Sequence, residues 1–148
     1  MTGALLCLII AISDGDTLKA RCGEPGAYQQ ITVRLAEIDA PEKRQAFGER
    51  SRQALAALCF QEQAAIRPTT RDRYGRTVAR VECRGRDVSA EQVRAGMAWA
   101  YLKYLTDPEI ARLEAAARAA RVGLWADHDE QIPPWLWRQD KKTGIPHQ

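Results

Sequence analysis

The stretch that decides the fold is Val33-Arg34-Leu35-Ala36-Glu37-Ile38-Asp39-Ala40-Pro41-Glu42. The apolar side chains of its first half predict a β-strand with one buried face. The strand leads into Asp-Ala-Pro-Glu, where Pro41 has no N–H to donate to a ladder. One strand and its exit turn therefore present the guanidinium of Arg34 and the carboxylates of Asp39 and Glu42.

Composition bounds the class of protein. The chain has 148 residues, 45% of them hydrophobic and 28% charged, which fits one globular domain and excludes a disordered chain. A net charge of +3 permits a polyanionic partner without requiring one. The apolar run 4–12 lacks a basic flank and a small-residue cleavage site and is too short to span a bilayer, so we expect a buried first strand and no membrane partner.

The four cysteines have neither the C-x-x-C spacing nor the neighbouring histidines of a zinc site. They are either buried free thiols or two disulfides, Cys7–Cys22 across a predicted hairpin and Cys59–Cys83 between a helix end and a strand end. Either bridge would indicate an oxidising compartment, so we expect a secreted or periplasmic protein.

Periodicity and turn residues predict five strands, with one helix after the third strand and two more near the end. This order predicts an α+β fold, a small Greek-key barrel with helical additions, over residues 1–125. Residues 126–148 are predicted to be a Trp/Pro-rich tail packed on the domain. With Leu124 and Trp125 they form a strap docked by Trp125, Trp135 and Trp137 and frayed after Lys141. The predicted strands are 4–12, 18–22, 31–38, 64–67 and 77–83, and the predicted helices are 49–59, 89–96 with a Ser89 cap, and 108–121 with an Asp107 cap.

The polar residues at the strand ends indicate a particular chemistry. Asp16, on the Asp-Gly-Asp turn after the first strand, and Asp39 are hard oxygen ligands suited to Ca²⁺ or Mg²⁺. Glu42 has the properties of a general base, and Arg34 and Arg76 can each bind phosphate oxygens with two donors. This set, with no histidine or cysteine nucleophile, fits phosphodiester hydrolysis by water and a metal ion rather than acyl transfer.

Four blocks together resemble the staphylococcal nuclease (thermonuclease) family, in order and spacing, over about residues 4–125. They are Asp14-Gly15-Asp16-Thr17, Val33-Arg34-Leu35 with Asp39-Ala40-Pro41-Glu42, Asp72-Arg73-Tyr74-Gly75-Arg76, and Arg94-Ala95-Gly96-Met97-Ala98. The resemblance implies an OB-fold, a five-stranded Greek-key barrel with three helices, and hydrolysis of DNA and RNA with Ca²⁺ as cofactor.

The same resemblance implies roles for single residues. Asp16 and Asp39 match the carboxylate ligands of the cation, and Ala40 falls where the family has a threonine that coordinates through its backbone carbonyl. Asp14 matches a group that supports these ligands, and Glu42 matches the proposed general base.

On the substrate side, Arg34 and Arg76 match the two phosphate-binding arginines. Arg73 falls at a basic position of the family, Tyr74 matches a nucleotide-contacting tyrosine, and Tyr101 and Tyr104 lie near further groove tyrosines. The connection after Glu42 is shorter than in the family, which bears on the preference between single and double strands.

Two other functions stay open. An OB barrel with basic and aromatic residues can bind single-stranded nucleic acid without cleaving it, and the tryptophan-rich tail can support an interaction domain. Each residue also has a purely structural explanation: Asp14 and Asp16 can shape a turn, and Arg34 can pair with Glu37 or Glu42. We expect a monomer with nucleic acid as its substrate.

Overall fold

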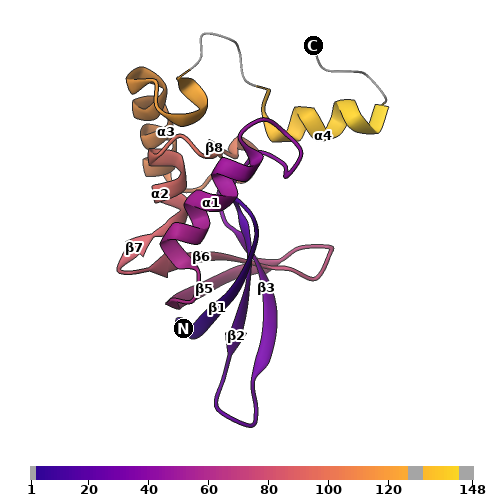
Figure 1. Cartoon of the computed structure of the whole chain (residues 1–148), viewed down its shortest axis with the longest axis vertical. Coiled ribbons are helices and arrows are strands. Elements are labelled where there is room, and N and C mark those ends of the chain that lie inside the picture. The colour runs from indigo at the N-terminus through magenta and orange to yellow at the C-terminus, as the bar shows by residue number, and fades with distance from the viewer. Residues whose placement is uncertain (1–2, 127–131, 144–148) are drawn as a thin grey trace.

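The computed structural model describes residues 3–126 and 132–143, and five of its strands form a closed mixed barrel. Neighbouring strands are antiparallel except for β3 and β6, whose parallel pairing of Val33 with Thr77 and Leu35 with Ala79 closes the barrel (Figure 1). This is the predicted OB-type α+β fold. The barrel strands are β1 (Leu5–Asp14), β2 (Thr17–Cys22), β3 (Gln29–Leu35), β5 (Gln63–Arg71) and β6 (Thr77–Cys83).

Helices gather at one end of the barrel, and the β2–β3 hairpin extends from the other end. Two-residue strands and short 3-10 helices lie between the longer helices and strands. The remaining elements are β4 (Ile38–Asp39), α1 (Gly48–Cys59), β7 (Arg86–Asp87), α2 (Val88–Arg94), β8 (Trp99–Ala100), η1 (Leu102–Tyr104), α3 (Pro108–Ala120), η2 (Gly123–Trp125) and α4 (Pro134–Thr143).

The core fills the barrel and the space beneath the helices. Ile9, Leu18, Val33 and Ile66 are fully buried because alternate side chains of each strand point inward. Burial of each such side chain stabilises the fold by about 1.5–3 kcal/mol, as an upper estimate.

The predicted strand 31–38 is two strands, a correction to the sequence analysis. Glu37 adopts a left-handed conformation with φ of 72°, and this turn separates β3 from β4. Because β4 leaves the barrel, it pairs instead with β8, Asp39 opposite Trp99. The strand predicted at 64–67 also differs, since β5 passes a register shift between Pro68 and Thr70 and ends at Arg71.

Helix starts are partly as predicted. Asp107 caps α3 by accepting a hydrogen bond from the Glu109 amide, with Pro108 in the first turn. The predicted Ser89 cap is wrong: Asp87 caps α2 by accepting from the Ala90 amide. Ser89 is buried and donates its hydroxyl to the Ala36 carbonyl, so its polar atom joins α2 to the β3–β4 turn.

The tail contains a helix that the sequence analysis did not predict. Trp125 and Trp135 pack edge-on against Trp99, and residues from Pro134 onward form α4. The helical backbone continues past Lys141 to Thr143, and the rest of the predicted frayed end lies outside the described residues.

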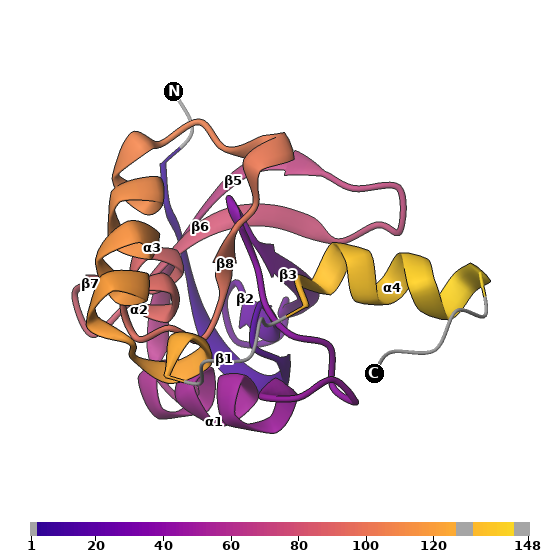
Figure 2. The same ribbon diagram turned by 90° about the horizontal axis from the view of Figure 1, so that it is seen from above.

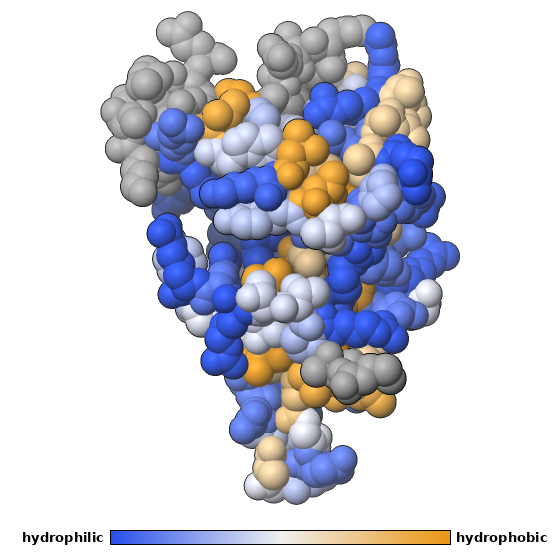
Figure 3. All heavy atoms as spheres, turned by 180° about the vertical axis from the view of Figure 1, so that it is seen from behind, coloured by the Kyte–Doolittle hydropathy of each residue, from blue (hydrophilic) through white to orange (hydrophobic). Residues whose placement is uncertain are grey.

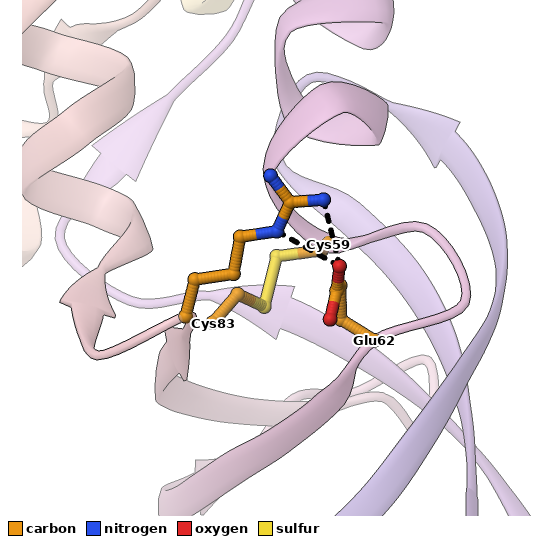
Figure 4. The surroundings of a disulfide bond; sticks show 4 residues. Cys59, Glu62 and Cys83 are labelled. Atoms are coloured by element: carbon orange, nitrogen blue, oxygen red, sulfur yellow. Dashed lines mark hydrogen bonds and ion pairs between the residues drawn. A yellow bond between two sulfur atoms is a disulfide. The ribbon is translucent and has the colours of Figure 1, made fainter.

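Both disulfides left open by the sequence are present. Cys7–Cys22 joins β1 to β2, and Cys59–Cys83 joins the end of α1 to the end of β6, beside Glu62 (Figure 4). All four thiols are therefore used, and the free-thiol alternative is wrong.

The face seen in Figure 3 is mainly hydrophilic, with hydrophobic side chains in separate patches. In the described part of the chain, every helix is too short or too polar to cross a membrane.

Candidate active site at the ends of β1, β3 and β4

The β1–β2 turn places Asp16 at the helical end of the barrel. The Asp14 carboxylate accepts the Asp16 amide at 3.0 Å, which tightens the turn. Gly15, whose φ is not positive, is required on this turn by close packing. A Cβ there would lie 1.7 Å from Ser51 Oγ on α1.

A hydrogen bond across the barrel end joins this turn to β4. The buried Asp16 carboxylate accepts the Ala40 amide at 2.7 Å and the Thr17 hydroxyl at 3.0 Å. Asp39 is fully buried at the end of β4. Two acidic side chains that lie 23 residues apart in the sequence thus share one buried corner.

Arg34, near the end of β3, supplies the positive charge of this corner. Its Nη2 lies 3.1 Å from Asp39 and 3.4 Å from Asp16, and its Nη1 donates to the Leu35 and Ile38 carbonyls, both at 2.8 Å. The guanidinium therefore holds the β3–β4 turn and balances two carboxylates at once. Its predicted alternative partner Glu37 pairs with Arg80 instead.

Burial and neighbouring charges shift the pKa values of Asp14, Asp16 and Asp39 in different directions. Burial, strengthened by the charge of Asp16, raises the pKa of Asp14 to about 8, so Asp14 is largely protonated at neutral pH. Burial opposes ionisation of Asp16, but the charge of Arg34 and the hydrogen bonds it receives hold its pKa below the ordinary value. Burial, with the charge of Asp16, raises the pKa of Asp39 to about 6 despite its two arginine partners.

Glu42 lies at the mouth of this corner, in the connection that leads to α1. Its amide donates to the Gln45 side chain at 3.1 Å. Gly48 begins α1 so close to it that a Cβ would lie 2.1 Å from the Glu42 carbonyl oxygen. The close start of α1 fixes the backbone here, while the Glu42 side chain remains about one third exposed.

One residue of this corner was missed by the sequence analysis. Arg138, on α4, donates to both Asp39 oxygens, at 2.6 Å and 3.2 Å, and its Nη1 also donates to Glu42. The contacts join residues 96 and 99 positions apart, so no local spacing could indicate them. The only sequence signal was its position directly after Trp137 in the docked tail.

The predicted substrate-binding residues form two other groups. Arg73 and Arg76 lie over the exposed Tyr74 ring on the β5–β6 turn, and Arg76 pairs with Asp72 at 2.7 Å. Within residues 3–126 and 132–143, no hydrogen bond or ion pair joins Arg76 to the carboxylates of the corner.

The second group consists of tyrosines near η1. Tyr101 contacts Tyr104 edge-on, with ring centroids 5.1 Å apart, and stacks on Trp135 of α4 at 5.5 Å. Tyr101 thus adjoins the helix that carries Arg138, whereas Tyr104 is exposed.

The Ca²⁺ implied by the resemblance requires oxygen ligands that lie close together. Within the described residues, no three Asp, Glu, His or Cys side chains converge as a preformed metal site. Asp16, Asp39 and the Ala40 carbonyl nevertheless offer only oxygen donors, and a hard cation completes such a set with water. The Arg138 guanidinium across Asp39 and Glu42 shows that a positive charge is accommodated here. The donor set fits a cation that keeps several waters.

The structure thus defines the class of protein as an OB-type barrel that gathers buried carboxylates and an arginine at its strand ends. The sequence model of the family described as "Staphylococcal nuclease homologue" matches residues 32–127, more than half of the chain. The chain belongs to this family.

Curated relatives resemble it over nearly the whole length. The chain is 44% identical over 139 residues to a Haemophilus influenzae protein named "Uncharacterized endonuclease", covering 94% of this chain and 76% of that protein. It is 41% identical over 147 residues to a "Micrococcal nuclease" of Shigella flexneri, covering 92% and 82%. It is 44% identical over 146 residues to "Protein ParB" of Escherichia coli, covering 91% and 80%.

Proposed function

We propose that this protein is a Ca²⁺-dependent nuclease that hydrolyses phosphodiester bonds of DNA and RNA by attack of water. The observation that carries the proposal is the buried corner in which Arg34 balances Asp16 and Asp39 while Glu42 lies at its mouth. Family membership and relatives named as nucleases support the same chemistry.

The carboxylates of Asp16 and Asp39 and the Ala40 carbonyl would hold the cation. When bound, Ca²⁺ supplies positive charge that neutralises the phosphate and lowers the pKa of water. Asp14 supports this arrangement from the β1–β2 turn through its hydrogen bond with the Asp16 amide.

Glu42 takes the proton of the attacking water in this proposal. Its side chain is the accessible carboxylate of the corner, so a water molecule can reach it, unlike the fully buried Asp39. As the water oxygen bonds to phosphorus, negative charge grows on the phosphoryl oxygens and the P–O bond to the leaving oxygen breaks. The leaving oxygen takes a proton from solvent water and departs as a hydroxyl group.

Arg34 and Arg76 stabilise that charge. Arg34 is held rigidly by backbone carbonyls, so its Nη2 is already oriented, which favours electrostatic stabilisation. Arg76 is one third exposed on the β5–β6 turn and can pair with a phosphate in place of Asp72.

Two surfaces would contact the rest of the substrate. Arg73 and Tyr74 offer a charge and an exposed ring on the β5–β6 turn, and Tyr101 and Tyr104 offer rings near η1. Bases of any sequence stack on such rings, so we expect little base specificity. We further propose that residues 1–125 are the catalytic domain, that 126–148 are an appendage, and that the protein acts as a monomer.

Cleavage and binding of a labelled single-stranded DNA, measured together, test the proposal. We expect cleavage with Ca²⁺ and none with a chelator. The observation that favours the alternative, a non-catalytic binding module, is the exposed pair of Arg73 and Tyr74. Retained binding without cleavage in Ca²⁺ would support that module and contradict the nuclease.

A further inference from the structure

The Arg138 side chain occupies the carboxylates that the proposed cation needs. Its two terminal nitrogens cover both oxygens of Asp39, and one of them also reaches Glu42. This is the paired geometry of a strong arginine–carboxylate contact. Because a guanidinium stays charged at any ordinary pH, this contact brings a permanent positive charge to Asp39 and Glu42.

The start of α4 is fastened to the body independently of this contact. Trp135 stacks on Tyr101 with the ring planes 5° apart and packs edge-on against Trp99. Just before the helix, the Ile132 carbonyl accepts a hydrogen bond from the Gln45 side chain. Arg138 lies three residues after Trp135, so the two side chains share one face of α4.

Beyond this turn, α4 extends away from the barrel in both ribbon views (Figures 1 and 2). Fastening at Trp135 thus keeps the Arg138 side chain beside the carboxylates, and releasing that side chain does not require the tryptophan contacts to break.

The two Asp39 oxygens offer about four lone-pair positions. Arg34 uses one of them and Arg138 uses one on each oxygen, so Arg138 competes with a divalent cation for Asp39 through both position and charge. While Arg138 is in place, it pairs with Asp39 and Glu42, and Arg34 pairs with Asp16 and Asp39, so two arginines offset the carboxylates of the corner. When Arg138 leaves, the net negative charge of the corner is larger and attracts a cation more strongly.

We propose that Arg138 is a built-in competitor of the divalent cation, and that α4 is an autoinhibitory strap that keeps the site closed until the cation displaces this guanidinium. The inference rests on the proposed function, since it assumes that Asp39 binds the cation. The apparent association constant for the cation is the intrinsic one multiplied by the fraction of molecules in which Arg138 has left Asp39.

Calorimetric titration of Ca²⁺ into the protein without nucleic acid tests the inference. We expect Arg138→Gln to bind Ca²⁺ on the order of tenfold more tightly, which corresponds to release of Arg138 in about one wild-type molecule in ten. Arg138→Lys keeps the charge but not the two-pronged contact, so its affinity should fall between the two. Arg112→Gln, which removes an arginine from an exposed pair on α3, should match the wild type.

Thermal unfolding supplies a second readout. Without Ca²⁺, Arg138→Gln should unfold at a lower temperature than the wild type, because Asp39 loses a partner. With Ca²⁺ its melting temperature should rise by more than that of the wild type. Arg138→Lys is the milder substitution because it keeps the positive charge, so it still tests the inference if Arg138→Gln folds poorly.

The outcomes separate the two proposals. Equal or weaker Ca²⁺ binding by both Arg138 variants would overturn the competitor and leave the nuclease proposal standing. Absence of Ca²⁺ binding in the wild type and in every folded variant would overturn both. Tighter binding by Arg112→Gln to the same extent would reduce the effect to net charge and overturn the competitor.

Discussion

At Arg34 a single guanidinium has a structural and a proposed chemical role. It is the partner that Asp16 and Asp39 share, and its side chain is only 13% exposed. The position of Arg34 beside Asp39 is predictable from the sequence because both belong to one strand and its turn. The two carbonyl contacts are not predictable, because they depend on the Glu37 turn.

Arg34→Ala should therefore affect stability as well as turnover. Removing Arg34 takes the arginine partner from the buried Asp16 and leaves Asp39 with Arg138, and we expect a loss of about 3 kcal/mol in the free energy of unfolding. Urea unfolding measures it. Arg67→Ala, in an exposed pair with Glu82, should cost less than about 1 kcal/mol. Equal losses would contradict the shared-partner role of Arg34.

Arg76→Ala should separate activity from stability. Its guanidinium is partly exposed and pairs with Asp72, so we expect a stability change within about 1 kcal/mol. If Arg76 stabilises the phosphate, steady-state cleavage should slow by on the order of 10²-fold. Arg84→Ala, which breaks an exposed pair with Glu62, is the matched control. Near wild-type turnover of Arg76→Ala would remove Arg76 from the site.

At the scale of elements, one arginine–carboxylate network holds the site's frame. The Glu37 carboxylate accepts from the Thr106 amide at 2.7 Å and also pairs with Arg80. Arg80 in turn bonds to Asp87 and Asp107, the capping residues of α2 and α3. The β3–β4 turn is thereby joined to the first turns of two helices.

This network predicts a dependence of stability on pH. Burial opposes ionisation of Glu37, but hydrogen bonds from Thr106, Asp107 and Arg80 lower its pKa below the ordinary 4.5. A carboxyl whose folded pKa is lowered stabilises the fold above its unfolded pKa, and this stabilisation is lost as pH falls below about 4.5. Glu37→Gln should cost about 2 kcal/mol at pH 7.

Denaturant unfolding of wild type and Glu37→Gln at neutral and acidic pH measures this. The difference between them should shrink as the pH falls below 4.5, since the wild-type carboxyl then becomes protonated. A difference that stays constant with pH would show that the Glu37 charge does not contribute.

Elements with strong local signals were predictable, and elements defined by distant partners were not. The periodicity of α1 and the Asp107-Pro108 start of α3 are visible in the sequence. The two-residue strands β4 and β8 have no periodicity, and they exist because Ile38 and Asp39 meet Ala100 and Trp99. The helix α4 was missed because its tryptophans indicated docking without a helical pattern.

At the scale of the whole molecule, one disulfide joins two barrel strands and the other connects the barrel to its helical cover. Cys7–Cys22 fastens a hairpin, whereas Cys59–Cys83 fastens α1, which packs against the β1–β2 turn through Ser51. Export to an oxidising compartment stays a prediction that these bridges favour.

Loss of either bridge should destabilise the protein measurably. Their sequence separations of 15 and 24 residues correspond to about 3 kcal/mol each in the chain-entropy description. Paired Cys→Ala variants, one for each bridge, allow the losses to be measured separately by calorimetry. An unchanged melting temperature in either pair would mean that the corresponding bridge does not stabilise the fold.

The most direct measurement is the rate at which Glu42→Gln cleaves a labelled single-stranded DNA in saturating Ca²⁺, relative to the wild type. Glu109→Gln, a surface change on α3, serves as the control. We predict a fall of on the order of 10²-fold or more for Glu42→Gln, with substrate binding retained and the control unchanged. A folded Glu42→Gln variant that cleaves at the wild-type rate would contradict the assignment of this corner as the active site.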